Sequence, residues 1–193
     1  MESKLLNEIS NFEEKYYQEN SKNVLFKKNQ KIDLAKQVSN NFDINILLNN
    51  LCYIIKDTNK VVIDYNILKL FANEDNFDCI LQYILFNFTE TIKKYNNFEV
   101  HMNLNSFTIS AAERYKKLVE LFCKLCLNNK DSYDYAKICT KFYIYNVSTT
   151  FEQIVTLFKP FVSPDVKEKV SVLKKSESTD NLWNSLIGIN NIK

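Results

Sequence analysis

Two hydrophobic periodicities alternate along most of this 193-residue chain. In residues 98–105, apolar and polar side chains alternate with a period of two, which is typical of a strand with one buried face. In residues 75–95, apolar side chains recur every three or four positions, which is typical of an amphipathic helix. Parallel strands need a crossover connection, usually a helix, so this alternation predicts an α/β fold with a mainly parallel sheet and flanking helices.

The same patterns divide the chain into two parts. Residues 1–59 are predicted to be a helical segment, and residues 60–193 to be a domain of alternating strands and helices. The first helix is marked by Leu5, Ile9, Phe12 and Tyr16. Residues 23–41 are interpreted as a looser helix or a linker, and residues 44–55 as a helix capped by Asp43. Strands are expected in residues 60–71, 98–105, 141–146 and 170–173, and helices in residues 75–95, 111–129, 151–158 and 176–187.

The composition argues against several classes of function. Gly188 is the only glycine, so the clustered glycines of nucleotide phosphate loops are missing. His101 is the only histidine, and its place in an alternating strand directs it away from the apolar face, so we predict no catalytic site and no enzyme. The formal net charge is +2 and Arg114 is the only arginine, which argues against nucleic acid as a partner.

The cysteines and the hydropathy pattern indicate the compartment. Five cysteines, mostly in apolar runs, are expected to be free buried thiols of a cytoplasmic, soluble protein. Cys123 and Cys126 have the spacing of half a zinc site but are interpreted as neighbours in a helix, so no metal or cofactor is predicted. We find no signal peptide pattern and no span of about 18 apolar residues. The surplus of Asn, Lys and Ile is typical of an AT-rich genome, such as that of a large DNA virus or a protist.

Residues 135–173 carry the most specific motif of the chain. A tyrosine is followed by an aromatic strand that ends in Asn146, a helix that begins with Phe151, a break at Lys159-Pro160-Phe161, and the pair Lys169-Val170. This order and spacing resemble the C-terminal half of the CRAL-TRIO (Sec14-like) lipid-binding domain, with weaker similarity over residues 60–187. Where the family has Pro-Glu after the tyrosine, this chain has Ala136-Lys137.

The resemblance implies a hollow α/β fold with an apolar cavity, closed by a mobile gate over residues 149–164. Thr149, Pro160 and Pro164 would belong to the gate. Phe151, Phe158 and Phe161 would face the ligand, and Lys169 would meet a headgroup phosphate. Read without the resemblance, these phenylalanines are core residues and Lys169 is a solvated lysine.

Two functions of different classes follow from the resemblance. The first is non-catalytic binding of a hydrophobic ligand, a phospholipid or phosphoinositide, with transient or peripheral membrane contact. The alternative is a protein-interaction or self-association module that keeps the fold but has filled the cavity. The amphipathic helix in residues 2–19 is expected to dock on the domain itself, or else on a partner helix.

Overall fold

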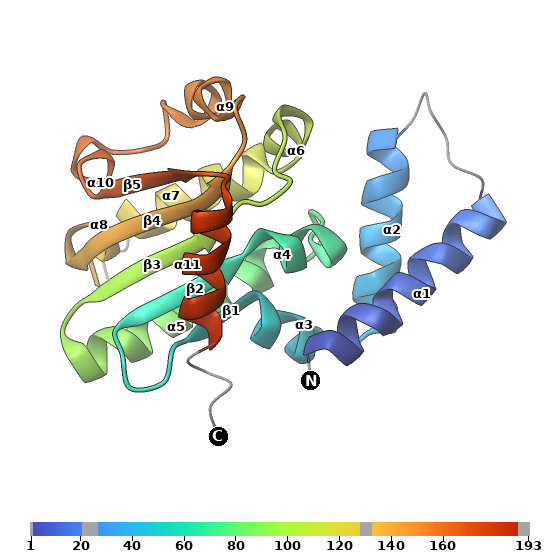
Figure 1. Ribbon diagram of the computed structural model, residues 1–193, viewed down its shortest axis with the longest axis horizontal. Coiled ribbons are helices and arrows are strands. Elements are labelled where there is room, and N and C mark those ends of the chain that lie inside the picture. Colours follow the sequence, from blue (N-terminus) through green and yellow to red (C-terminus); the bar gives the residue numbers. More distant parts are fainter. Residues whose placement is uncertain (1, 21–26, 128–132, 189–193) are drawn as a thin grey trace.

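Five strands form a single sheet in the computed structural model, which describes residues 2–20, 27–127 and 133–188. The order in the sheet is the order in the chain: β1 (Cys52–Ile54), β2 (Lys60–Asp64), β3 (Phe98–Asn103), β4 (Cys139–Val147) and β5 (Val170–Lys174). β1 is antiparallel to β2, and every other neighbouring pair is parallel. The predicted α/β class with a mainly parallel sheet is therefore confirmed, and Figure 1 shows the strands side by side.

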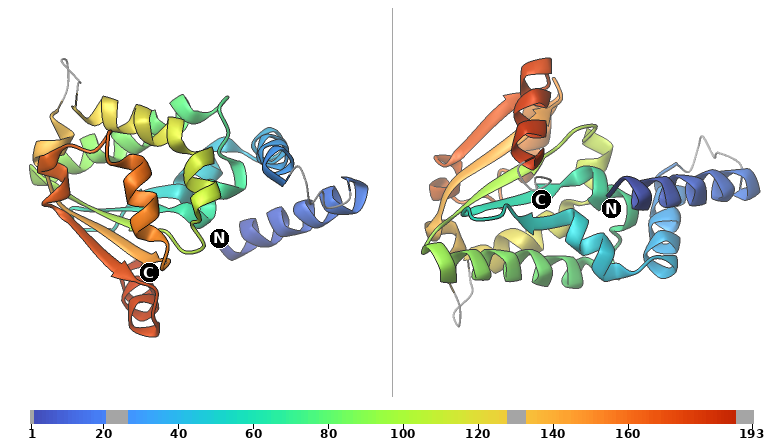
Figure 2. Two further views of the ribbon diagram at one scale, coloured as in Figure 1. Left: turned by 90° about the horizontal axis from the view of Figure 1, so that it is seen from above. Right: turned by 60° about the horizontal axis from the view of Figure 1, so that its bottom comes forward.

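The two faces of the sheet are covered unequally. Val61, Val100 and Phe142 are register partners on one face. That face carries α4 (Tyr65–Phe71), α5 (Phe77–Tyr95), α6 (Ile109–Arg114), α7 (Lys116–Leu127), α8 (Tyr135–Ile138), α9 (Phe151–Phe158) and α10 (Pro164–Lys167). The other face carries α11 (Glu177–Gly188), which Figure 2 shows across the sheet from α7 and α9. The larger apolar core therefore lies on the many-helix side.

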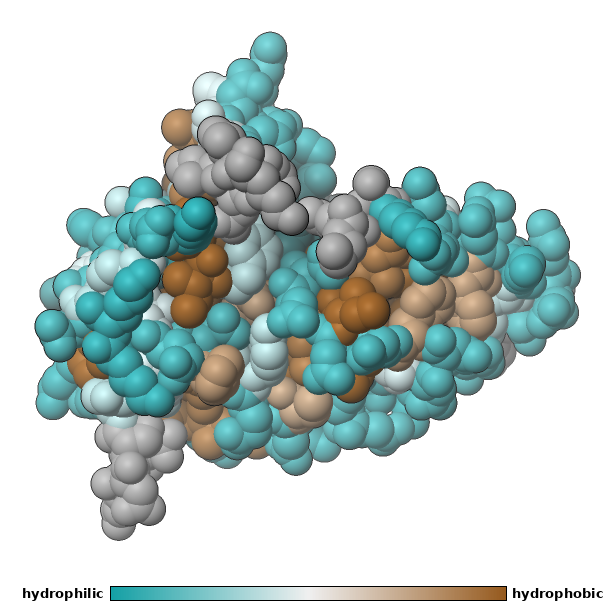
Figure 3. All heavy atoms as spheres, turned by 90° about the horizontal axis from the view of Figure 1, so that it is seen from below, coloured by the Kyte–Doolittle hydropathy of each residue, from teal (hydrophilic) through white to brown (hydrophobic). Residues whose placement is uncertain are grey.

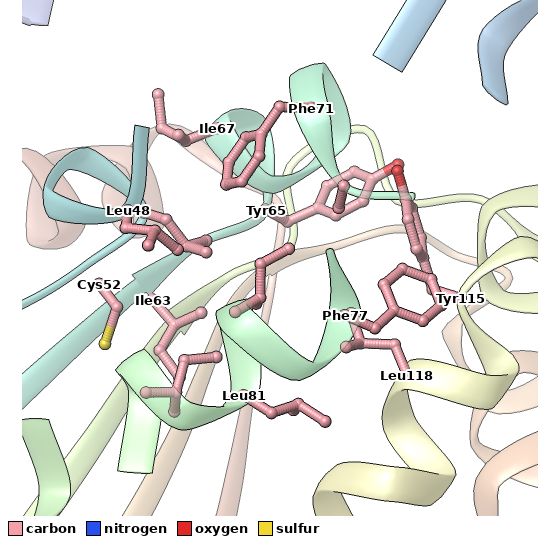
Figure 4. Close-up of a cluster of buried hydrophobic side chains, with 14 of the residues drawn as sticks. Leu48, Cys52, Ile63, Tyr65, Ile67, Phe71, Phe77, Leu81, Tyr115 and Leu118 are labelled. Carbon is pink, nitrogen blue, oxygen red and sulfur yellow. The ribbon is translucent and has the colours of Figure 1, made fainter. Parts of the chain in front are cut away.

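The centre of the core lies where α4 and α5 meet the sheet. Phe71 and Leu81 are almost completely buried there, and Tyr65 packs edge-on against Tyr115, with ring centroids 6.1 Å apart. Figure 4 shows these side chains converging from α4, α5 and, for Tyr115, the residue between α6 and α7. The apolar face predicted for residues 75–95 is the buried face of α5, because the helical period places Phe77, Leu81 and Phe88 on one side.

Three helices precede the sheet: α1 (Glu2–Asn20), α2 (Lys27–Asn41) and α3 (Ile44–Leu51). In α1, Leu5, Ile9 and Tyr16 are buried and Phe12 is partly buried, as the apolar stripe predicts. The Tyr16 hydroxyl donates a hydrogen bond of 2.7 Å to Asp33, which fastens α1 to α2. Figure 1 shows this helix pair beside α4, so α1 docks within its own chain.

The sequence assigned three segments incorrectly. The helix expected to continue to Ile55 ends at Leu51, and β1 follows because it pairs antiparallel with β2. β1 thus lies before Lys60, the predicted boundary between the two parts of the chain, which stays a prediction. The strand expected over residues 60–71 ends at Asp64, whose side chain accepts from the Asn66 amide at 2.7 Å and begins α4.

The third segment is the helix expected over residues 111–129. It is broken at Tyr115, whose backbone leaves the helical region, so α6 and α7 are separate helices. Residues 128 and 129 lie outside the described part of the chain. The break lets the Tyr115 side chain turn into the core, where it is almost fully buried.

The cysteines are all free, as predicted, but they are not all buried. Cys52 and Cys139 are buried, Cys123 and Cys126 are partly buried, and Cys79 is exposed on the outer face of α5. The expectation of burial was wrong for Cys79 because helical periodicity turns it away from Phe77 and Ile80.

Two further features of the structure concern the membrane and the outer surface. Within the described residues, no helix is long and apolar enough to cross a membrane. Figure 3 shows the surface seen from below as mainly hydrophilic, with separate hydrophobic patches. Among the exposed apolar side chains are Ile46 of α3 and Phe86 of α5.

Candidate functional site

A cavity of about 820 Å³ lies between the sheet and its helices. Its floor is formed by strand residues that point to the many-helix face, including Val100, Phe142 and Ile144. Its walls come from α5, α7 and α9, with Phe88 and Phe122 among the larger side chains. This volume falls within the range of small-molecule sites, roughly 300 to 1,000 Å³, and nearly all of the lining residues are apolar.

The three phenylalanines predicted to face a ligand all line this cavity. Phe151 and Phe158 are the first and last residues of α9, and Phe161 lies in the turn that follows. All three are only partly buried, whereas Ile154 on the same helix is almost completely buried. Ile154 therefore holds α9 on the protein, and the phenylalanines form the inner surface of one wall.

The segment expected to act as a gate has defined ends. Just before its start, Asn146 takes a left-handed backbone conformation with a φ of 58°, as the next-to-last residue of β4, which ends at Val147. The Asn146 amide nitrogen donates to the Asn103 side-chain oxygen at 3.2 Å, which ties this end to β3. Thr149 lies in the exposed turn between this anchor and α9.

The two prolines occupy different positions at the end of the segment expected to act as a gate. Pro160 lies in the turn after α9. Proline would disrupt the interior of a helix, so the helix ends before it. Pro164 is the first residue of α10, a position that needs no backbone N–H, and Ser163 caps this helix through the Val166 amide at 3.4 Å. Both prolines therefore separate short elements, as the sequence pattern indicates. Neither they nor Thr149 line the cavity.

Lys169 lines the cavity beside β5 and is held in place by two hydrogen bonds. Its ammonium donates to the carbonyl oxygens of Ala136 at 2.7 Å and of Lys137 at 2.9 Å. These two residues stand where the family motif has Pro-Glu, and their backbone, not their side chains, holds the lysine. An ammonium group has three N–H donors, so one remains for another acceptor.

Two other lysines that line the cavity were missed by the sequence analysis. Lys159 follows α9 and Lys167 lies in α10, and both are exposed. The only sequence feature that could have identified them is that they lie in the same motif-bearing stretch as Lys169. Nothing in their spacing distinguishes them from ordinary surface lysines, which is why they were not selected.

Three cysteines, Cys123, Cys126 and Cys139, also line the cavity. Burial raises the pKa of Cys123 and of Cys139 to about 11 and also raises the pKa of Cys126. These thiols are therefore protonated and poorly nucleophilic at neutral pH. Among the residues that the structure describes, no group of three His, Cys, Asp or Glu side chains could hold a metal ion.

His101 lies on the other face of the sheet, as its strand position predicts, and is almost completely buried. Its Nδ1 lies 2.9 Å from the Tyr145 hydroxyl, and its Nε2 lies 3.4 Å from a Glu99 carboxylate oxygen. The ring stacks on Tyr143, with centroids 4.9 Å apart. Burial lowers the pKa of His101, although Glu99 acts in the opposite direction. The sheet separates this cluster from the cavity.

Comparisons with known proteins agree with this geometry. The family model described as the CRAL/TRIO domain matches residues 49–187 of the chain. Among solved structures, the crystal structure of Sfh5 is similar in fold, with a TM-score of 0.53 and 16% sequence identity. The similarity covers 89% of this chain and 67% of that chain. A search of curated proteins finds no match.

Proposed function

Because the chain belongs to the CRAL/TRIO domain family, which is a lipid-binding family, we propose that it binds a phospholipid in its cavity without catalysing a reaction. The observation that carries this proposal is the cavity of about 820 Å³ with its almost wholly apolar lining. Burial of acyl chains would drive binding, at roughly 0.8 kcal/mol for each CH₂ group removed from water. Within the described residues, no Asp, Glu or His lines the cavity, and the cysteine thiols that do are protonated at neutral pH, which supports a binding role.

Four side chains have proposed roles in this site. Phe151, Phe158 and Phe161 would contact the acyl chains, and Lys169 would direct its remaining N–H toward the headgroup. For a ligand to enter the cavity, α9 would have to move. The segments that flank α9 contain Thr149 before it and Pro160 and Pro164 after it. Such a lipid-binding protein would work in the cytoplasm and meet membranes transiently.

A cavity-blocking variant tests this function. Ile144 is a floor residue of β4, so we expect Ile144→Trp to fill the cavity and to abolish lipid uptake from phosphatidylcholine vesicles. Tyr143→Trp is the matched control, because Tyr143 is the neighbouring residue on the opposite face. Uptake is measured by mass spectrometry of the repurified protein. Equal lipid content in both variants, or none in the unmodified protein, would contradict the proposal.

A second candidate function is a protein-interaction module. It is favoured by the exposed Phe86 and Ile46 side chains, of which 57% and 45% are accessible to solvent. Phe86→Ser combined with Ile46→Ser should then weaken self-association or partner capture, measured by light scattering and pull-down. The open cavity supports the lipid proposal more strongly, since a module that had lost its ligand was expected to have bulky side chains filling this space.

A further inference from the structure

The charged residues that line the cavity all have the same sign. They are Lys159, Lys167 and Lys169, and no aspartate or glutamate belongs to the described lining. The same stretch contains the acidic residues Asp165 and Glu168, but both are exposed and neither lines the cavity. The local charge at this opening is therefore positive, although the chain as a whole is nearly neutral.

The three lysines differ in the hydrogen bonds and ion pairs that their ammonium groups form within the protein. Lys169 gives two of its three donors to backbone carbonyl oxygens. In the part of the chain that the structure describes, Lys159 and Lys167 form no ion pair, whereas several other exposed lysines do, including Lys36, Lys117 and Lys124. Both ammonium groups at the opening thus keep all their donors for water or a ligand.

The apolar part of the opening lies directly beside this charge. Val155 and Val172 line the cavity and are nearly half exposed, and Phe161 has the Lys116 ammonium 5.9 Å from its ring centroid. A molecule seated here would place apolar groups inside and meet positive charge where it leaves the cavity. A neutral molecule would use only the first of these two features.

We infer that the cavity selects an amphiphile with an anionic head, a phosphate or a carboxylate, which Lys159 and Lys167 pair with at the opening while Lys169 is kept in place by α8. This inference rests on the proposed function, because it specifies the ligand of the same cavity. Lysine suits such a head as a mobile point charge that does not require a fixed bidentate geometry. The attraction is partly screened by salt, since both lysines are exposed.

Matched single-chain probes test the inference without a membrane. Decyl phosphate and decanol, each offered below the concentration at which it aggregates, are titrated calorimetrically against the full chain. We expect decyl phosphate to bind on the order of tenfold more tightly than decanol, and this ratio to fall in 0.5 M NaCl, because two exposed charge pairs contribute modestly. The double variant Lys159→Gln, Lys167→Gln should lose most of this preference, and the donor that remains on Lys169 accounts for what is left. Lys141→Gln, Lys174→Gln is the control, because these exposed lysines of β4 and β5 do not line the cavity.

The outcomes separate this inference from the proposed function. Equal affinity of the unmodified protein for both probes would overturn charge selection while leaving lipid binding intact. Failure to bind either probe, together with no uptake from vesicles, would contradict the proposed function itself. Inorganic phosphate is the third probe, and binding as tight as that of decyl phosphate would overturn the inference by identifying a site for the free anion. An equal loss in the control variant would also overturn it.

Discussion

Single residues fix the chain on either side of the segment that is proposed to act as a gate. Asn146 combines a left-handed backbone with a side-chain bond to Asn103, and Lys169 bonds the carbonyls of Ala136 and Lys137. Asparagine adopts the left-handed region more readily than most residues, so the backbone of β4 can change direction there, one residue before the strand ends at Val147. The chain thereby makes its sharp turn without glycine.

Substitution of Asn146 separates the backbone conformation from the hydrogen bond. Both Asn146→Ala and Asn146→Gly lose the bond to Asn103, but only alanine carries a Cβ that the left-handed conformation disfavours. We expect the alanine variant to be less stable than the glycine variant by about 1 kcal/mol in urea unfolding. A glycine variant that is equally or more destabilised would show that strain at this position is negligible.

His101 should make stability depend on pH. Its folded pKa is lowered by burial, so the unfolded state binds more protons once the pH falls below the ordinary value of about 6.5. Stability should therefore be full above that pH and decrease as the pH falls toward the folded pKa, by at most about 1.4 kcal/mol per pH unit. The groups facing the ring are Glu99 on β3, Tyr143 and Tyr145 on β4, Trp183 on α11 beside Tyr145, and Lys60 on β2.

The measurement compares the unmodified protein with His101→Gln by urea unfolding at pH 7.5 and pH 5.5. The variant lacks the titrating group, so its stability should change less between the two values. Carboxylates that do not contact His101 contribute equally to both proteins and cancel in the comparison. The same decrease in both proteins would contradict the assignment to His101.

Among the elements, α5 shows most directly how one helix serves both core and surface. Phe88 is 1% exposed, lines the cavity and stacks on Phe98 with centroids 4.5 Å apart, whereas Phe86, two residues earlier, is 57% exposed. We expect Phe88→Ala to reduce the free energy of unfolding by about 3 to 5 kcal/mol. Phe86→Ala should change it by less than about 0.5 kcal/mol, as surface substitutions usually do. Similar losses in chemical denaturation would contradict this view of the helix.

At the scale of the whole molecule, the sheet separates the side that contains the cavity from a side that is closely packed. The cavity side is hollow, and the other side is a small solid core in which Trp183 is 5% exposed against Tyr145. A ligand in the cavity should therefore raise the midpoint of thermal unfolding without changing the emission maximum of Trp183. At a ligand concentration of 100 Kd, the expected stabilisation is about 2.7 kcal/mol.

The probe for this experiment is a short-chain phosphatidylcholine below its micelle concentration. Phe158→Trp provides the positive control, since it places a second indole in the lining, where emission should shift as lipid replaces water. A shift from Trp183 in the unmodified protein would mean that the two sides of the sheet are coupled.

By itself, the sequence determined the α/β class, the strands from residue 98 onward, most of the helices and the motif around the gate. It could do so because hydrophobic periodicity and the positions of proline and asparagine act over a few residues. The same local patterns predicted a helix where β1 forms, and a strand where α4 forms. β1 forms because it pairs with β2, which is another segment of the chain. α4 begins because the side chain of Asp64 caps it.

Only the tertiary structure decided that a cavity exists and which charges open onto it. Phe151, Phe158, Phe161 and Lys169 were selected from the motif and do line that cavity, but Lys159 and Lys167 were not selected. An apolar helix face has the same sequence pattern whether it meets a filled core or an empty volume. Whether space remains between two such faces depends on how side chains from segments far apart in the chain pack together, and local spacing carries no information about that.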